Sequence, residues 1–446
     1  MIDGLKPYPK YKDSGLPWLC NVPSHWSRER GKRLFTRMER PVRPGDEIVT
    51  CFRDGMVTLR KNRRLRGFTE AIYELGYQGI RKGDLVIHAM DAFAGAMGVS
   101  DSDGKCTPEY LVCIPHSPAI SPRYYAAVLR YIAFQGFILV SCPAVRERAP
   151  RFRFPNFGDM RFPVPTHDEQ AAIVRFLDHA NGKIERAIRA KRKLIALLNE
   201  QKQAIIHRAV TRGLDPNVKL KPSGIPWLGD VPEHWEIRRL KFLAHIKTGG
   251  RDTVHRRDDG AYPFFVRSQT VERINTYSFD GEAVLTAGDG AGVAKVFHYV
   301  NGKFDYHQRV YKFSNFKEIS GRFFFHYFSD TLRFEAFRET AKSTVDSLRL
   351  PMLQDFPGVL PPSNEQLKLI EFIERETATL RVAISRAERE IELLREYRTT
   401  LTADVVTGKL DVREAVKGLL AEDEEPSPVE DEGEDIEESD TTEAEE

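Results

Sequence analysis

The fold is decided by residues 166–211, which read THDEQAAIVRFLDHANGKIERAIRAKRKLIALLNEQKQAIIHRAVT. Apolar residues recur along this stretch with a 3-4 spacing for about five heptads, the pattern of a helix that packs along a second helix. It begins with Thr166-x-x-Glu169, a capping signal whose side chains can satisfy free backbone N–H groups, and it ends beside Gly213. We therefore predict one long helix here.

The chain contains a second copy of this stretch at residues 363–407. With an offset of 196 and no gap, Glu169-Gln170 falls on Glu365-Gln366, and Leu214-Asp215 falls on Leu410-Asp411. The second copy has its own capping signal, Ser363-x-x-Gln366, and ends near Gly408. Because both copies lie in one chain, we predict that the two helices pair with each other as an intramolecular coiled coil. Two unrelated helices, or dimerisation between chains, are the alternatives.

The predicted seam of this coiled coil consists of one set of apolar positions from each copy. In the first copy these are Leu177, Ile184, Ile188, Ile195, Leu198 and Ile205, and in the second Ile373, Leu380, Ile384, Ile391, Leu394 and Leu401. Lys191 and Lys202 interrupt the first seam, and Thr377 and Arg398 interrupt the second.

A second internal repeat contains all four tryptophans. Residues 14–26 read SGLPWLCNVPSHW and residues 223–235 read SGIPWLGDVPEHW, identical at nine of thirteen positions. We call them the Trp segments. Proline and glycine favour an extended backbone, and the expected role of the tryptophans is to anchor the chain against a domain; base stacking is the alternative. The neighbouring His25 and His234 are expected to be structural.

Two globular domains are predicted between these repeats. In the first, residues 48–52, 84–88 and 110–114 are expected strands and 122–134 a helix; in the second, residues 282–285, 293–299 and 309–313 are expected strands and 323–337 a helix. The expected fold class is α+β: two β-rich globular domains, two long antiparallel helices forming an intramolecular coiled coil, and a pseudo-twofold repeat. The predicted divisions are 1–165, 166–212, 213–362, 363–410 and 411–446.

Charge is distributed unevenly along the 446 residues. Residues 421–446 hold 15 acidic and no basic residues, which leaves 67 basic against 50 acidic residues in 1–420, a net charge of +17. A body this basic has affinity for polyanions, whereas the acidic tail is expected to be disordered. Five scattered cysteines without C-x-x-C spacing suggest reduced thiols in a cytoplasm, and we expect neither a membrane span nor a signal peptide.

The usual catalytic signatures are missing from the sequence. It has no phosphate-binding loop, H-E-x-x-H or G-x-S-x-G motif, and no run typical of amino-methyltransferases. The glycines of residues 288–292 predict a tight turn beside a strand rather than a cofactor cradle. The sequence therefore favours binding over catalysis, with no metal site.

Basic and polar loop residues are the candidates for binding, because Lys and Arg neutralise phosphates and Arg or Gln can contact base edges. The candidates for DNA contact are Arg60, Lys61, Arg63, Arg64, Arg66, Arg146, Arg148, Arg151, Lys247, Arg251, Arg256, Arg257, Arg267, Gln269, Gln308, Arg309 and Lys342. The alternative for any one of them is a solvated charge with no partner.

Taken together, the layout resembles the specificity subunits of type I restriction–modification systems. The resemblance is carried by the repeated S-G-x-P-W-L-x-x-V-P-x-H-W segment, the P-x-x-x-E-Q helix starts and the T-G-K-L-D ending at Thr407, with a close match over residues 285–310. It covers nearly all of residues 11–415. The first domain matches less well than the second, and residues 211–215 are a variant of the ending.

This resemblance implies two target-recognition domains, each contacting one half of an asymmetric bipartite site in double-stranded DNA. The helices would set the spacer and dock two methyltransferase subunits, and motor-nuclease subunits could join for cleavage. No cofactor is expected in this chain; S-adenosylmethionine, ATP and Mg would belong to the partners. The alternatives are a non-catalytic coiled-coil scaffold for proteins with an incidental basic surface, and a self-sufficient nuclease or methylase.

Overall fold

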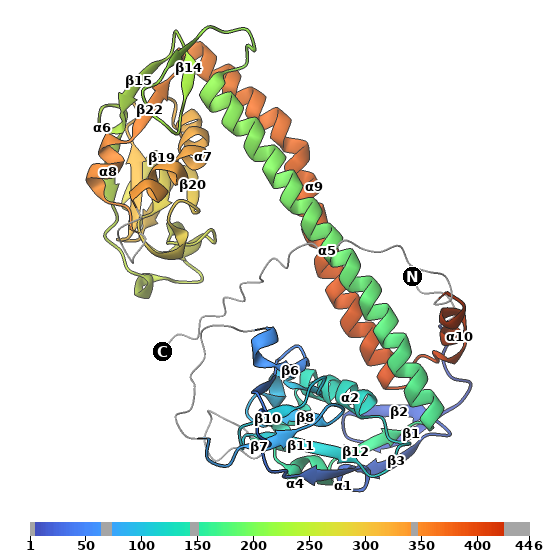
Figure 1. Cartoon of the computed structure of the whole chain (residues 1–446). Helices are drawn as coiled ribbons and strands as arrows, with labels where there is room; N and C mark the ends of the chain where they lie inside the picture. The colour runs from blue at the N-terminus through green and yellow to red at the C-terminus, as the bar shows by residue number, and fades with distance from the viewer. Residues whose placement is uncertain (1–4, 64–73, 143–150, 340–346, 423–446) are drawn as a thin grey trace. The chain divides into compact units, whose positions relative to one another are not determined.

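The computed structural model describes residues 5–63, 74–142, 151–339 and 347–422. The chain divides into two compact units (Figure 1). Unit 1 comprises residues 1–188 together with 392–446, and unit 2 comprises residues 189–391. Each unit therefore contains one β-rich domain and one stretch of each long helix. None of the helices in the described ranges is long and apolar enough to cross a membrane.

The domain of unit 1 is built mainly from short strands. Its elements are β1 (Tyr11–Leu16), β2 (Leu19–Pro23), β3 (Ser27–Arg30), α1 (Gly31–Leu34), β4 (Phe35–Met38), β5 (Val49–Cys51), β6 (Val57–Leu59), η1 (Arg60–Asn62), β7 (Gln78–Ile80), β8 (Leu85–His88), η2 (Ala92–Ala94), β9 (Met97–Val99), β10 (Gly104–Cys106), β11 (Tyr110–Pro115), α2 (Pro122–Phe134), α3 (Phe137–Ser141), α4 (Phe154–Asp159) and β12 (Arg161–Val164). An antiparallel sheet in the order β4-β11-β8-β9 forms its centre, and α2 packs on β8 and β9. The hairpin β5–β6 joins this group through parallel bridges from Ile48 to Lys105 and from Val57 to Ser100.

The domain of unit 2 has a larger sheet of the same kind. Its elements are β13 (Leu220–Pro222), β14 (Asp230–Pro232), β15 (Glu236–Arg239), α6 (Leu240–Leu243), β16 (His245–Thr248), η3 (Thr253–His255), β17 (Tyr262–Phe265), β18 (Glu272–Ile274), β19 (Phe279–Ala287), η4 (Gly290–Gly292), β20 (Phe297–Tyr306), β21 (Val310–Ser314), α7 (Gly321–Glu339), α8 (Leu350–Asp355) and β22 (Pro357–Leu360). The sheet order is β16-β21-β19-β20-β17-β18, and only β17 and β20 run parallel. Helix α7 packs on β19 and β20 with Phe323, Phe324 and Phe328 in the core.

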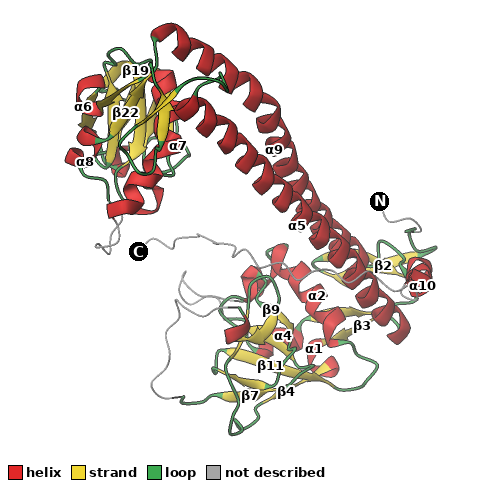
Figure 2. Cartoon of the chain, turned by 45° about the horizontal axis from the view of Figure 1, so that its top comes forward, coloured by secondary structure: helices red, strands yellow, loops and turns green. Residues whose placement is uncertain are grey.

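Both predicted long helices are present as α5 (His167–Arg212) and α9 (Ser363–Val406) (Figures 1 and 2). In unit 1, Arg398 of α9 lies 3.4 Å from Glu185 of α5, and in unit 2, Lys191 of α5 lies 2.6 Å from Glu390 of α9. From Glu185 forward to Lys191 on α5, the partner on α9 moves back from Arg398 to Glu390, so the helices pair antiparallel, as predicted. Lys191 and Arg398, which interrupt the apolar seam, are the residues that form these ion pairs.

The seam positions differ in their burial. Ile373 lies in the core of unit 2, and Ile184, Ile188, Ile384 and Ile391 are also buried, whereas Ile195, Leu198 and Leu380 are half-buried. Two helices alone cannot enclose a seam on all sides, so some seam positions keep partial exposure. Thr377, another of the polar residues that interrupt the seam, is buried, and its hydroxyl donates a hydrogen bond to the carbonyl of Ile373.

Most predicted strands and both domain helices match the structure. The exception is residues 293–299, where β20 begins only at Phe297. The turn beginning at Gly288 continues through η4 and through Ala294, whose φ of 56° cannot belong to a strand. The glycine-rich residues 288–292 do form the predicted tight turn beside β19.

Only one of the two capping boxes forms. The Thr166 backbone N–H donates to Glu169 at 3.1 Å, and the Glu169 N–H donates to the Thr166 hydroxyl at 3.4 Å. In the second copy, the Gln366 side chain instead accepts from Ser320 N at 2.7 Å and donates to the carbonyls of Glu318 and Pro361. Gln170 has the same contacts in unit 1, with Ser121 N, Ala119 O and Pro165 O. The glutamine of this motif therefore fixes the helix start to its domain rather than capping it.

The Trp segments anchor the helix ends, as predicted. Trp26 and Trp235 are fully buried, which excludes base stacking by these two side chains. In unit 2, the residue after α5, Gly213, packs against Trp235, and in unit 1 Gly408 after α9 packs against Trp26. His25 and His234 contact Glu169 and Glu365 in the first turns of the two helices. Each Trp segment thus holds the end of one long helix and the start of the other.

The two ends of the described chain meet in unit 1. The Asp411 N–H donates to the Lys6 carbonyl at 2.7 Å, and the Tyr11 hydroxyl donates to the Lys409 carbonyl at 3.0 Å. Helix α10 (Arg413–Glu422) adds Val416 and Leu419 to the core of this unit. The repeat is therefore closed into a ring by contacts between its ends. The tail predicted to be disordered was residues 421–446; its first two residues end α10, and residues 423–446 lie outside the described residues.

Candidate nucleic-acid interface

Loops from four strands meet at one corner of the unit 2 sheet, which we call loop corner 2. It consists of residues 249–252 after β16, 266–271 after β17, 288–292 after β19 and 307–309 between β20 and β21. Backbone hydrogen bonds join these loops: Gln308 N to Arg251 O at 2.8 Å, His307 N to Phe265 O at 2.9 Å, and Gly288 N to Arg309 O at 2.7 Å. Candidates from separate parts of the sequence are therefore brought together by the fold.

Two of these candidates share one carboxylate. Arg267 Nη1 lies 3.1 Å from Asp289 Oδ1, and Arg309 Nη1 lies 3.3 Å from Asp289 Oδ2. The Asp289 side chain is 18% exposed, whereas those of Arg267 and Arg309 are 50% and 64% exposed. One carboxylate can occupy only part of two guanidinium groups, so N–H donors remain directed outward from this corner.

A buried aspartate fixes the neighbouring loop. Asp305 is 1% exposed and accepts hydrogen bonds from Thr276 and Ser278 at 2.8 Å and from Arg251 Nε at 3.2 Å. Beside it, Gln308 donates to Asp252 at 2.8 Å. A hydrogen bond from Thr253 holds the pKa of Asp252 below its ordinary value, while burial lowers the pKa of His307 and favours its neutral form. Arg251 and Gln308 are thus held in place by their acceptors.

The other candidates of unit 2 lie apart from Asp289. Arg256 pairs with Glu272 at 3.2 Å, and the Gln269 amide donates to the Lys295 carbonyl at 3.1 Å. Arg257 donates to the carbonyl of Arg256. Lys247 is exposed on β16 opposite Lys312, and burial together with Lys247 lowers the pKa of Lys312 to about 8.

In unit 1, the described candidates already have partners. Lys61 pairs with Glu47 and Arg63 with Asp54, each at 2.5 Å, and Arg151 pairs with Glu109 at 3.2 Å. Arg60 lies in η1 with Nε 3.4 Å from the Thr50 hydroxyl. The candidates Arg64, Arg66, Arg146, Arg148 and Lys342 lie outside the described residues.

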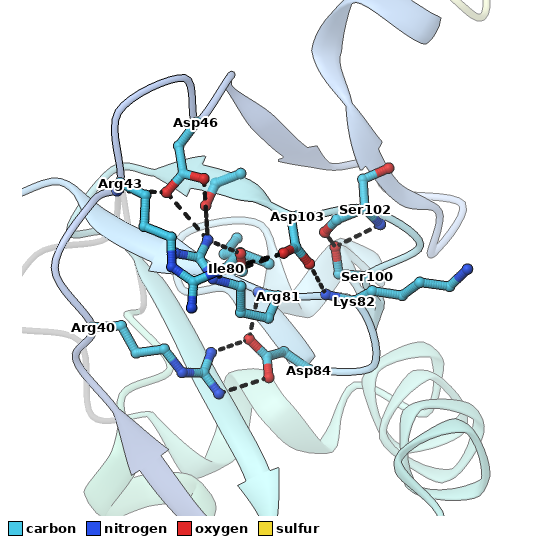
Figure 3. Close-up of polar contacts among 11 residues, drawn as sticks. Arg40, Arg43, Asp46, Ile80, Arg81, Lys82, Asp84, Ser100, Ser102 and Asp103 are labelled. Atoms are coloured by element: carbon cyan, nitrogen blue, oxygen red, sulfur yellow. Dashed lines mark hydrogen bonds and ion pairs between the residues drawn. The ribbon is translucent and has the colours of Figure 1, made fainter.

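A second charged cluster in unit 1 fixes the turn between β7 and β8 (Figure 3). Asp84 accepts from both guanidinium ends of Arg40 and from the Arg81 N–H, and Arg81 Nη1 donates to Asp46 at 3.1 Å. The Lys82 N–H donates to Asp103 at 2.9 Å. Since these arginines are largely buried against carboxylates, we interpret the cluster as structural rather than as an anion site.

Comparison with known proteins supplies the family. Residues 232–393 match the model of the family described as "Type I restriction modification DNA specificity domain". The chain is similar to the type I restriction enzyme EcoDI specificity subunit of Escherichia coli, with 28% identity over 183 residues, covering 41% of this chain and 40% of that protein. Residues 232–393 thus carry the specificity domain of this family, and the chain as a whole is similar to type I specificity subunits.

A second relative and a solved structure are also similar to this chain. The MjaVIII specificity subunit of Methanocaldococcus jannaschii is 29% identical over 93 residues, covering 21% of this chain and 20% of that protein. The matches therefore span less than half the length of these relatives. A chain from a solved structure of a type I R-M system, described in terms of complex assembly and conformational transition, has the same fold, with a TM-score of 0.60 at 14% identity over 87% of this chain and 99% of that one.

Sequence reasoning missed two residues that lie together in loops of unit 1. Arg53 Nη2 lies 3.0 Å from Asp91 Oδ1, and neither residue belongs to a basic run. Asp289, which holds Arg267 and Arg309, was also missed. The sequence did contain a pattern that could have identified these aspartates: the offset of 198 residues that relates Gly83 to Gly281 also relates Asp91 to Asp289.

Proposed function

We propose that this chain is the DNA-recognition component of a type I restriction–modification complex, in which each β-rich domain contacts one half of an asymmetric bipartite duplex site. One observation carries the proposal: exposed guanidinium groups from separate loops converge on one corner of the unit 2 sheet, where Asp289 holds two of them. Arginines fixed in this way suit contact with base edges as well as phosphates. The family assignment supports the same function.

The long helices would set the spacer between the half-sites and dock two methyltransferase subunits. Exposed apolar side chains on them support a protein-binding role: Leu194 is 42% and Leu197 54% exposed on α5, and Leu393 is 47% exposed on α9. Such residues on a helix that already has a partner favour a further protein contact. Methyl transfer, with S-adenosylmethionine, and any ATP- and Mg-dependent cleavage by motor-nuclease subunits would occur on the partners.

Salt dependence of DNA binding tests the recognition role. The full-length chain should bind duplex DNA with an affinity that falls about 10³- to 10⁵-fold between 50 and 200 mM salt if it contacts six to ten phosphates. An affinity that does not change with salt would favour the alternative of a protein-interaction scaffold with an incidental basic surface.

A second experiment tests where the chemistry resides. The purified chain alone, given duplex DNA and radiolabelled S-adenosylmethionine, should transfer no methyl group, and adding methyltransferase subunits should restore transfer. Labelling of DNA by the chain alone would show that it is itself a methylase.

A further inference from the structure

The same arginine–aspartate pair occurs in both units. In unit 1, Arg53 Nη2 lies 3.0 Å from Asp91 Oδ1, and in unit 2, Arg267 Nη1 lies 3.1 Å from Asp289 Oδ1. Few loop residues of the two domains can be aligned, because their sequences have diverged. A charged pair that both loops share is therefore unusual.

The pairs occupy equivalent places in the topology. Arg53 lies two residues after the end of β5, and Arg267 lies two residues after the end of β17. Both strands open a hairpin, β5–β6 and β17–β18. Ile48, directly before β5, forms a parallel bridge to Lys105 of β10, and β17 pairs in parallel with β20. Asp91 and Asp289 lie in the turns after the central strands β8 and β19.

Backbone packing around each pair is also shared. A Cβ atom on Gly95 would lie 3.0 Å from the Arg53 carbonyl oxygen, and one on Gly292 would lie 2.6 Å from that of Arg267. Phe152 N donates to Ala89 O at 3.0 Å in unit 1, and Leu348 N donates to Gly288 O at 2.7 Å in unit 2. In each unit, a glycine and a neighbouring segment therefore pack against the loop that carries the pair. We take the pair as a feature of the repeat and not as a chance surface contact.

The geometry of the pair fits one kind of ligand. The arginine side chains are 66% and 50% exposed, whereas the aspartates are 32% and 18% exposed. The carboxylate engages one nitrogen of each guanidinium and limits its rotation, which leaves other N–H donors facing solvent. A fixed, planar pair of donors matches the O6 and N7 acceptors of guanine in the major groove.

We propose that Arg53 and Arg267 are matched guanine-contacting residues, one for each half-site, and that Asp91 and Asp289 are positioning residues for them. This proposal rests on the proposed function.

The domains differ beside the pair. In unit 2, Arg309 places a second guanidinium on Asp289, whereas unit 1 has Glu109, paired with Arg151, in the equivalent turn. One shared contact and different neighbours would give two half-sites that each contain a guanine and otherwise differ.

Selection from a randomised duplex library tests the arginines. The probe is the full-length chain together with its methyltransferase partners, as wild type, Arg53→Lys and Arg267→Lys. Lysine keeps the positive charge but loses the planar donor pair. Each variant should lose about 5- to 160-fold of its preference for guanine over other bases at one position, because a bidentate contact contributes about 1–3 kcal/mol. The affected position should lie in one half-site for Arg53→Lys and in the other for Arg267→Lys.

Matched controls exist in the same repeat. Arg123 pairs with Asp178 at 2.7 Å, and Arg322 pairs with Glu374, both joining a domain helix to a long helix away from the loops. Arg123→Lys and Arg322→Lys should leave the selected sequence unchanged. If Arg53→Lys and Arg267→Lys also leave it unchanged while the wild type selects a bipartite site, the guanine assignment is overturned and the proposed function stands. If the wild type selects no sequence at all, both are overturned.

The positioning role of Asp91 and Asp289 is tested by a measurement that a purely structural role would not change, the ratio of specific to non-specific affinity. Asp91→Asn and Asp289→Asn remove a negative charge from the surface, so binding to unrelated duplex DNA should strengthen, while the ratio of specific to non-specific affinity should fall. A loss of thermal stability with an unchanged specificity ratio would overturn the positioning role.

Discussion

Nε2 of His25 lies 2.8 Å from Oε1 of Glu169, which joins the first Trp segment to the first turn of α5. The same contact recurs between His234 and Glu365 at 2.7 Å in unit 2. Two motifs that are far apart in the sequence are thus halves of one junction. This contact, together with those of Gln170 and Gln366, fixes the start of each long helix to its domain.

The first prediction concerns this junction and pH. Burial alone would raise the pKa of Glu169, but hydrogen bonds from His25 and Thr166 outweigh it and hold the pKa below its ordinary value of 4.5. A depressed folded-state pKa stabilises the fold above the unfolded-state pKa, and this contribution is lost as the pH falls through the folded-state pKa. Glu169→Gln should therefore lower the free energy of unfolding by about 1–3 kcal/mol at neutral pH.

Chemical unfolding at a series of pH values measures this effect. The gap in stability between the wild type and Glu169→Gln should be constant above about pH 5 and narrow at lower pH. A gap of constant size down to pH 3 would show that the carboxylate charge contributes nothing.

The second prediction compares two glycines that end the long helices. Gly213 and Gly408 both have a φ of 76°, so alanine at either site should cost about 1–2 kcal/mol. A Cβ on Gly408 would also lie 2.5 Å from Pro23 Cδ and 2.7 Å from the Trp26 ring, whereas at Gly213 the nearest atom is 3.4 Å away. Gly408→Ala should therefore lower the melting temperature more than Gly213→Ala. Equal shifts in melting temperature would mean that Trp26 and Pro23 can move to accommodate the added methyl group at little cost.

The third prediction concerns the helix seam in unit 2. Ile373 is fully buried between α9 and the domain, whereas Leu380 is half-buried in the middle of the helix pair. Ile373→Ala should cost about 2–5 kcal/mol, and Leu380→Ala clearly less, because a cavity at an open site can be filled by water or by neighbouring side chains. Urea unfolding of the two variants measures both values; a larger loss for Leu380→Ala would contradict the burial pattern.

The fourth prediction concerns modularity. Replacing residues 236–357 with the equivalent domain of another specificity subunit should change one half of the methylated site and leave the other half unchanged. Sequencing of methylated DNA from cells that carry the hybrid system checks this. A change in both halves would contradict the assignment of one domain to one half-site.

The fifth prediction concerns the spacer. The heptad 189–195 of α5 contains Lys191, and the heptad 387–393 of α9 contains its partner Glu390. Deleting both heptads removes Lys191 together with its partner and shortens the pair by about 10 Å at 1.5 Å per residue. The spacer should shrink by about three base pairs, at 3.4 Å each. An unchanged spacer in the methylated site would exclude the helices as its determinant.

The sequence by itself determined the repeat, the two long helices and the α+β class, because 3-4 apolar spacing and a tryptophan-rich segment are local patterns that persist when loops diverge. It also indicated Arg267 and Arg309 as candidates through their polar surroundings. It misplaced the start of β20, since a positive φ at Ala294 leaves no trace in hydrophobic periodicity.

Only the tertiary structure decided which charges act together. Asp91 and Asp289 follow strands in ordinary turns, and their partners lie 38 and 22 residues away in the chain, so no local pattern links them. The structure likewise showed that Lys61 and Arg63 each pair with a carboxylate of their own, whereas Arg267 and Arg309 share Asp289. The physical reason is that a charge takes its role from its neighbours in space, whereas helices and strands follow from neighbours in sequence.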